Sequence, residues 1–147
     1  MSTATTVLQT ANQLTTNYDY SKIFLGNNRT ILATYVNSGE DPVELRPGRI
    51  MGRISASGNV LPLASAASDG SNLPIGVLMS SVDVDASESV EVTIAISGDI
   101  AEEKLLFSGS DTLNTVISGR RLRDRIASDT MGIYLVKSTE LTEYDNS

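Results

Sequence analysis

The sequence contains no cysteine, no histidine and no tryptophan. The absence of cysteine excludes disulfides, thiolate metal ligands and cysteine nucleophiles. The absence of histidine removes the usual general base and the commonest transition-metal ligand. We therefore expect no enzyme: no catalytic residue, no metal and no other cofactor.

Positive charge is also scarce. The 147 residues include 11 Lys and Arg against 18 Asp and Glu, giving a net charge of −7 and a pI near 4.4. A binder of duplex nucleic acid or of an anionic membrane needs a positive surface, so we expect neither partner. No apolar run reaches the ~18 to 20 residues of a transmembrane helix, and the N-terminus lacks the pattern of a secretory signal. We expect the chain to be made in the cytoplasm of its host cell and to stay there at first.

The length corresponds to one ordinary domain plus tails. Hydrophobic residues make up 40% of the chain, but only five Tyr and two Phe are aromatic. Val, Ile, Leu and Ala must therefore fill the core, a composition that suits a sheet better than a helical bundle. We predict a mostly β fold, a small barrel or folded sheet, with one late α-helix and an extended N-terminal arm.

Residues 45–79 hold the strongest local signals. Pro47 fixes φ and Gly48 tolerates positive φ, so this pair suits the centre of a type II turn. Alternation in the following RIMGRIS predicts a half-buried strand with Ile50 and Gly52 inside and Met51 outside. Gly52 leaves room on the inner face for a close neighbour.

Other segments complete the predicted sheet. Val90, Val92, Ile94 and Ile96 alternate strictly and predict the clearest strand, and residues 30–36, 104–107 and 133–136 predict others. Asp111 is a plausible N-cap for a helix that continues to about residue 126, bent or divided at Gly119.

Both ends of the chain differ from the middle. Residues 1–17 are poor in charge and rich in Thr, Gln, Asn and Ala, a composition that buries little apolar surface. Tyr18, Tyr20, Ile23 and Phe24 then form an apolar cluster, which is either a core strand or a docking segment. We assign residues 1–29 to an arm ordered by a partner, 30–136 to the β-rich domain and 137–147 to a polar tail.

Charged clusters elsewhere have ordinary explanations. The only basic cluster is Arg120, Arg121, Arg123 and Arg125. We interpret it as a solvated helix face that meets the acidic residues 83–103 of the same or a neighbouring subunit, rather than as a phosphate-binding site. The whole chain is acidic, and only one aromatic residue, Tyr134, lies nearby for bases to stack on. Asp83, Asp85 and Glu88 lack the pattern of a calcium-binding loop. Asp69, Gly70 and Ser71 lack the pattern of a hydrolase nucleophile. Glu102 and Glu103 lack the geometry of a glycosidase pair.

The succession of several motifs resembles the phage head decoration proteins of the lambda D type. The matching stretches are RPGRIMGRI at 46–54, SG at 57–58, ASDGS at 67–71 and PIGVL at 74–78, with weaker likeness in YDYSKIFLG at 18–26 and GIYLV at 132–136. The resemblance implies a β-tulip fold, an N-terminal arm ordered against the capsid shell, and a homotrimer on the outer surface of the virion. It places Tyr18, Tyr20, Ile23 and Phe24 at the major capsid protein.

The expected function is therefore that of a structural cement protein, which binds the outside of a bacteriophage head and stabilises the capsid against disassembly. An alternative is a receptor- or carbohydrate-binding module of a phage fibre or tail. A small carboxylate hydrolase is the enzymatic rival, but no pair of carboxylates has suitable geometry for it.

Overall fold

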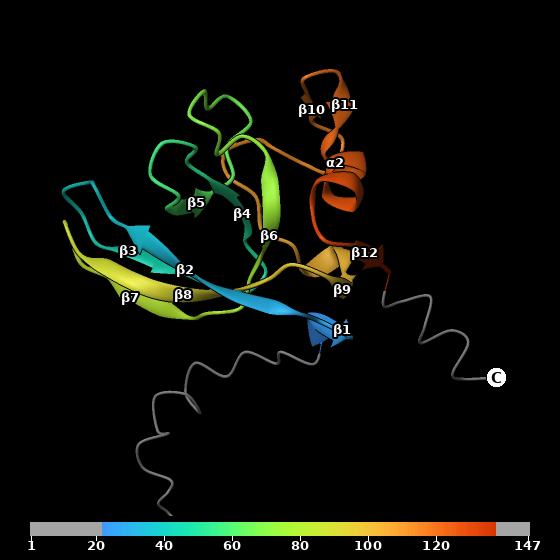
Figure 1. Cartoon of the computed structure of the whole chain (residues 1–147), viewed down its shortest axis with the longest axis horizontal. Helices are drawn as coiled ribbons and strands as arrows, with labels where there is room; N and C mark the ends of the chain where they lie inside the picture. Colours follow the sequence, from blue (N-terminus) through green and yellow to red (C-terminus); the bar gives the residue numbers. More distant parts are fainter. Residues whose placement is uncertain (1–21, 138–147) are drawn as a thin grey trace, which may run out of the picture.

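The computed structural model describes residues 22–137 of the chain. Twelve strands, one short 3₁₀ helix and one α-helix follow each other along this part (Figure 1). They are β1 Phe24–Gly26, β2 Thr30–Val36, β3 Val43–Leu45, β4 Ile50–Arg53, β5 Val60–Pro62, β6 Pro74–Leu78, β7 Val82–Val84, β8 Ser89–Ala95, β9 Gly98–Ala101, η2 Glu102–Lys104, β10 Val116–Ile117, β11 Arg120–Arg121, α2 Leu122–Asp129 and β12 Ile133–Val136. The predicted fold class, mostly β with a barrel and one late helix, is confirmed.

Five of the strands close a barrel in the order β2-β5-β4-β6-β8. Its longest ladder joins β2 and β8 in antiparallel register from Thr30 opposite Ala95 to Val36 opposite Ser89. The predicted alternation in β8 is confirmed: Val92 and Ile94 are buried inside the barrel, and Val90 and Ile96 pack against the same cluster. Since alternate residues of a strand share one face, this period directs one side of β8 into the barrel.

A second layer covers one side of the barrel. It consists of α2 and the three-stranded sheet β1-β9-β12, which lie together in Figure 1. The side chains between this layer and the barrel form a second core, which contains Ile50, Val77, Ile100, Leu122 and Ile133. The domain therefore has two apolar cores that share the barrel wall.

This double burial corrects the prediction for β4. The alternation predicts Met51 on an exposed face, but Met51 is fully buried inside the barrel, whereas its neighbour Ile50 is buried in the second core. Adjacent residues point to opposite faces of a strand, and both faces of β4 are covered. The period-2 pattern of a strand with one exposed face therefore does not describe β4, because a second layer covers its outer face.

The turn before β4 brings distant backbone segments close together. Gly48 has a φ of 100°, a value that glycine adopts readily and that the predicted turn requires. A Cβ atom there would lie 2.5 Å from the Lys104 carbonyl oxygen, and one on Gly52 would overlap the Ser71 backbone. Both positions thus need glycine because another chain segment passes against them.

The late helix is shorter than the sequence indicates. It begins at Leu122 rather than after Asp111, and residues 116–121 form the hairpin β10-β11 instead. The Asp111 carboxylate accepts hydrogen bonds from the backbone N–H and the hydroxyl of Ser65, at 3.0 and 2.6 Å, so it anchors a loop instead of capping a helix. Likewise, the strand expected at 104–107 is reduced to one bridge between Leu106 and Arg49.

Candidate functional site

The N-terminal segment enters the domain through the sheet β1-β9-β12. Phe24 is paired with Ile100 of β9, and the Ala101 N–H donates to the Ile23 carbonyl oxygen at 2.8 Å. The side chains of Ile23 and Phe24 are each only 8% exposed and belong to the second core. Their placement favours the core-strand alternative for these two residues, and it puts the start of regular structure before residue 30. Tyr18 and Tyr20 lie outside the described residues.

The same sheet exposes a large aromatic side chain. Tyr134 on β12 is 65% exposed, and Met131, just before the strand, is 69% exposed. Tyr134 is opposite Asp99 of β9, while its neighbour Ile133 points into the core. Since β12 is the last strand in the sheet order, one edge of its backbone has no neighbouring strand among residues 22–137. This sheet therefore combines an exposed aromatic, an open edge and the entry of the N-terminal segment.

The sequence pattern does not mark Tyr134 as an interaction residue. It predicts the strand IYLV, but period-2 alternation cannot say which face is covered when both faces contain apolar residues. Ile133 and Leu135 face the core and Tyr134 does not, a choice that depends on where α2 packs. Only the arrangement of layers identifies Tyr134 as exposed.

The basic cluster serves mainly internal contacts. Arg123 makes a bidentate pair with Glu102, with both nitrogen–oxygen distances at 2.8 Å. Arg120 donates to the Ser128 hydroxyl at 2.9 Å, and Arg121 lies 4.0 Å from Asp124. Arg123 thus meets Glu102 of the acidic residues 83–103, whereas Arg121 and Arg125 pair with Asp124 and Asp129 of α2 itself.

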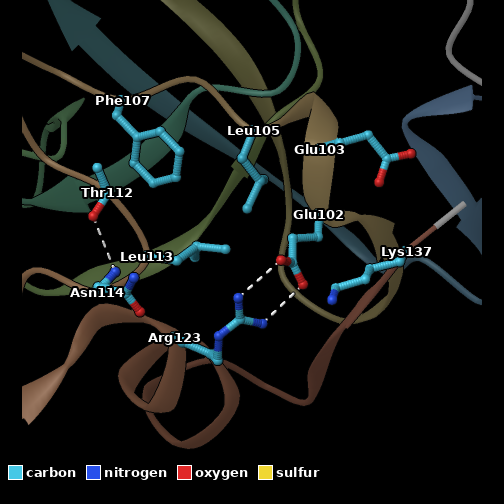
Figure 2. Close-up of a pocket in the computed structure, with 9 residues that line it drawn as sticks. All are labelled: Glu102, Glu103, Leu105, Phe107, Thr112, Leu113, Asn114, Arg123 and Lys137. Carbon is cyan, nitrogen blue, oxygen red and sulfur yellow. Dashed lines mark hydrogen bonds and ion pairs between the residues drawn. The ribbon is translucent and has the colours of Figure 1, made fainter. Parts of the chain in front are cut away.

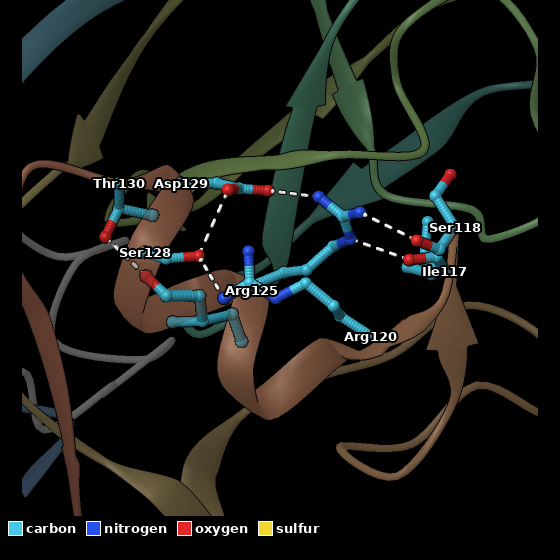
Figure 3. Close-up of polar contacts among 8 residues, drawn as sticks. Ile117, Ser118, Arg120, Arg125, Ser128, Asp129 and Thr130 are labelled. Atoms are coloured by element: carbon cyan, nitrogen blue, oxygen red, sulfur yellow. Dashed lines mark hydrogen bonds and ion pairs between the residues drawn. The ribbon is translucent and has the colours of Figure 1, made fainter.

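Arg125 is the most enclosed member of the cluster (Figure 3). Its guanidinium group donates to the carbonyl oxygens of Ile117 and Ser118, at 2.7 and 3.2 Å, and to the Asp129 carboxylate at 2.9 Å. Arg125 thereby holds the β10-β11 turn against α2. A guanidinium that is occupied in this way offers little to a phosphate group, which supports the structural interpretation of the cluster.

Two shallow cavities lie beside α2. The first, of about 470 Å³, is lined by side chains of the segment 102–114 together with Arg123 and Lys137 (Figure 2). The second, of about 430 Å³, lies between the 53–55 and 70–75 segments and the Arg125–Asp129 pair. Neither resembles the enclosed, mostly apolar pocket typical of a small-molecule site.

The acidic groups of the described part form no metal-binding cluster, and two of them have a lowered pKa. Within residues 22–137, no group of three or more His, Cys, Asp or Glu side chains is placed to hold a metal ion. Hydrogen bonds from Arg123 hold the pKa of Glu102 below its usual value, and the Ser71 hydroxyl and backbone N–H do the same for Asp69. A lowered pKa keeps each carboxylate ionised, the opposite of what a general acid requires.

No helix in the described part of the chain is long and apolar enough to cross a membrane. Several large apolar side chains of the described residues are exposed: Tyr134 on β12, Met131 just before it, Leu32 on β2, Leu73 before β6 and Val116 on the β10-β11 hairpin. The fold and surface together define a β-barrel protein whose features suit contact with another macromolecule.

Comparison with known protein families identifies that macromolecule in general terms. Residues 10–117 match the family described as Bacteriophage lambda head decoration protein D, and no curated protein matches the chain. Because the match covers most of the sequence, the chain belongs to the lambda head decoration protein D family. It is a structural capsid decoration protein of a bacteriophage virion, and its general partner is the phage capsid.

Proposed function

We propose that this protein binds the outer surface of the phage head at junctions between shell subunits and stabilises the shell against disassembly. Membership of the head decoration family supports the role in general. The observation that carries the proposal further is the location of β1. Its pairing in the sheet that exposes Tyr134 means that the N-terminal segment joins the domain beside an exposed aromatic side chain.

The proposed contact with the major capsid protein combines two parts. One is the segment before Ile23, which contains Tyr18 and Tyr20 and lies outside the described residues. The other is the exposed face of the β1-β9-β12 sheet, represented by Tyr134. The family resemblance assigns Ile23 and Phe24 to the shell contact, but in this proposal they act as core residues that fix the segment to the domain.

A truncation tests the first part. A chain that starts at Lys22 retains Ile23, Phe24 and β1, so it should melt like the full-length protein. It should fail to sediment with purified empty heads and fail to protect them against heat. A truncation starting at Asn28 is the contrasting variant, because it also removes two core side chains and should lose stability as well. Head binding by the chain that starts at Lys22 would assign the contact to the folded domain alone.

We further propose that three copies act together as a homotrimer on the head. Ordering an extended segment on binding costs about 1 to 2 kcal/mol per residue in backbone entropy, so one segment alone binds weakly. After one segment of a trimer has bound, the other two bind at high effective concentration. A reconstruction of decorated heads should show threefold units, and isolated monomers or twofold dimers would contradict this. The same map tests whether the fold is a β-tulip.

The receptor- or carbohydrate-binding alternative receives no support from the surface. Among the exposed large hydrophobic side chains of residues 22–137, Tyr134 is the only aromatic, and sugars generally stack on aromatic rings. Co-sedimentation with empty heads separates the two functions, because a fibre or tail module would remain in the supernatant.

A further inference from the structure

The cavity of about 470 Å³ beside α2 has an apolar floor. Leu105 and Leu113 are largely buried beneath it, and Phe107 is partly exposed along one wall (Figure 2). These residues belong to the segment 102–115, which has little regular structure after η2. The segment is connected to α2 by the Arg123–Glu102 pair and by a 3.0 Å hydrogen bond from the Arg123 N–H to the Leu113 carbonyl oxygen.

Charged groups surround this floor on the side of α2. Arg123 spans the two oxygens of Glu102, so the pair presents little net charge to the cavity. Lys137 extends its side chain towards the pair in Figure 2 and contributes to lowering the pKa of Glu102. The rim thus combines an apolar surface with the Lys137 ammonium group and the Glu103 carboxylate, beyond the neutralised Arg123–Glu102 pair.

The described chain ends at this same rim. Lys137, the last described residue, is one of the residues that line the cavity, and ten residues, STELTEYDNS, follow it. They carry two side chains suited to an apolar surface, Leu141 and Tyr144, among the acidic residues Glu140, Glu143 and Asp145. At up to about 3.3 Å per residue, Leu141 can reach about 13 Å from Lys137 and Tyr144 about 23 Å, so both can reach the floor.

We propose that residues 138–147 dock in this cavity of their own chain, with Leu141 and Tyr144 against Leu105, Phe107 and Leu113. The tether makes docking intramolecular, so weak apolar contacts suffice at the effective concentration that a short linker gives. The docked segment forms a strap that joins the irregular segment 102–115 to the end of β12, a role separate from head binding.

A paramagnetic label tests the proposal, because the chain contains no cysteine and one introduced cysteine is unique. A nitroxide on Thr142→Cys of the full-length chain should broaden the amide NMR signals of Leu105, Phe107 and Leu113. The signals of residues 85–88, in the β7-β8 turn, should keep their intensity.

The tether alone keeps the label near Lys137, so the decisive comparison is a labelled chain that also carries Leu141→Ser and Tyr144→Ser. Loss of both apolar anchors should lower the docked population by at least about tenfold, and broadening at the floor should fall accordingly. A matched control with Thr139→Ser and Ser147→Ala should broaden these signals as strongly as the parent. Equal broadening with and without the two anchors would overturn the proposal, as would broadening that appears only after empty heads are added.

Discussion

Replacement of Phe24 by alanine separates a core role for this residue from a role at the shell. Phe24 is 8% exposed and packs in the core between the barrel and the β1-β9-β12 sheet. Truncation of a buried phenylalanine removes its transfer free energy and leaves a cavity, a loss of about 3 to 5 kcal/mol in unfolding free energy. For a domain stable by about 5 to 15 kcal/mol, this is a large fraction of the total.

Urea unfolding followed by circular dichroism measures the effect. With an m-value of about 2 kcal/mol per molar urea, the midpoint for Phe24→Ala should fall by about 1.5 to 2.5 M. Leu32→Ala is the matched control: Leu32 is 67% exposed, so its truncation should change stability by less than about 0.5 kcal/mol. At temperatures where Phe24→Ala remains folded, it should still bind empty heads. An unchanged midpoint together with lost head binding would refute the core assignment and return Phe24 to the shell contact.

Three further outcomes are expected. Gly52→Ala should destabilise the domain by about 1 to 3 kcal/mol in thermal unfolding, because its Cβ overlaps the Ser71 backbone, whereas Gly39→Ala meets only a side-chain atom at 3.4 Å and should change little. The pKa of Glu102 is lowered in the folded state, so its pairing with Arg123 stabilises the fold above the usual value of 4.5 and this contribution is lost as pH falls below it. Arg123 is 39% exposed, so Glu102→Gln should cost only about 1 kcal/mol at pH 7, and the difference from the parent should shrink in urea titrations as the pH falls below 4.5. A chelator or a reductant should leave the melting temperature unchanged, and a large drop would reveal a bound metal or a cross-link.

Local sequence patterns predict a strand or a turn correctly where a single physical rule determines its conformation. The alternation in β8 depends only on one face lying inside the barrel, and the tight turn at Gly48 depends on a φ that few other residues adopt. The motif succession from residue 46 to residue 78 also indicates the family that comparison then shows. These features are local, so neighbouring residues are enough to specify them.

The predicted start of the late helix is wrong, because periodicity is ambiguous in short segments. Leu113, Val116 and Ile117 recur with a helical spacing, but residues 116–121 fold as a hairpin. Ile117 is buried in the second core, and its carbonyl oxygen accepts a hydrogen bond from Arg125 eight residues later. Contacts with α2 therefore override the local preference.

By itself, the sequence determines the mostly β class, the absence of cysteine and histidine chemistry, the acidic surface and the resemblance to head decoration proteins. Tertiary structure decides which faces are covered. It buries Met51 and Ile50 in separate cores, turns Ile23 and Phe24 inward and leaves Tyr134 outside. The physical reason is that the pattern of apolar residues in the sequence is the same whether a side chain packs in the barrel, against the second layer or against another protein. Only the packing of the β1-β9-β12 sheet and α2 on the barrel shows which of these surfaces remains exposed.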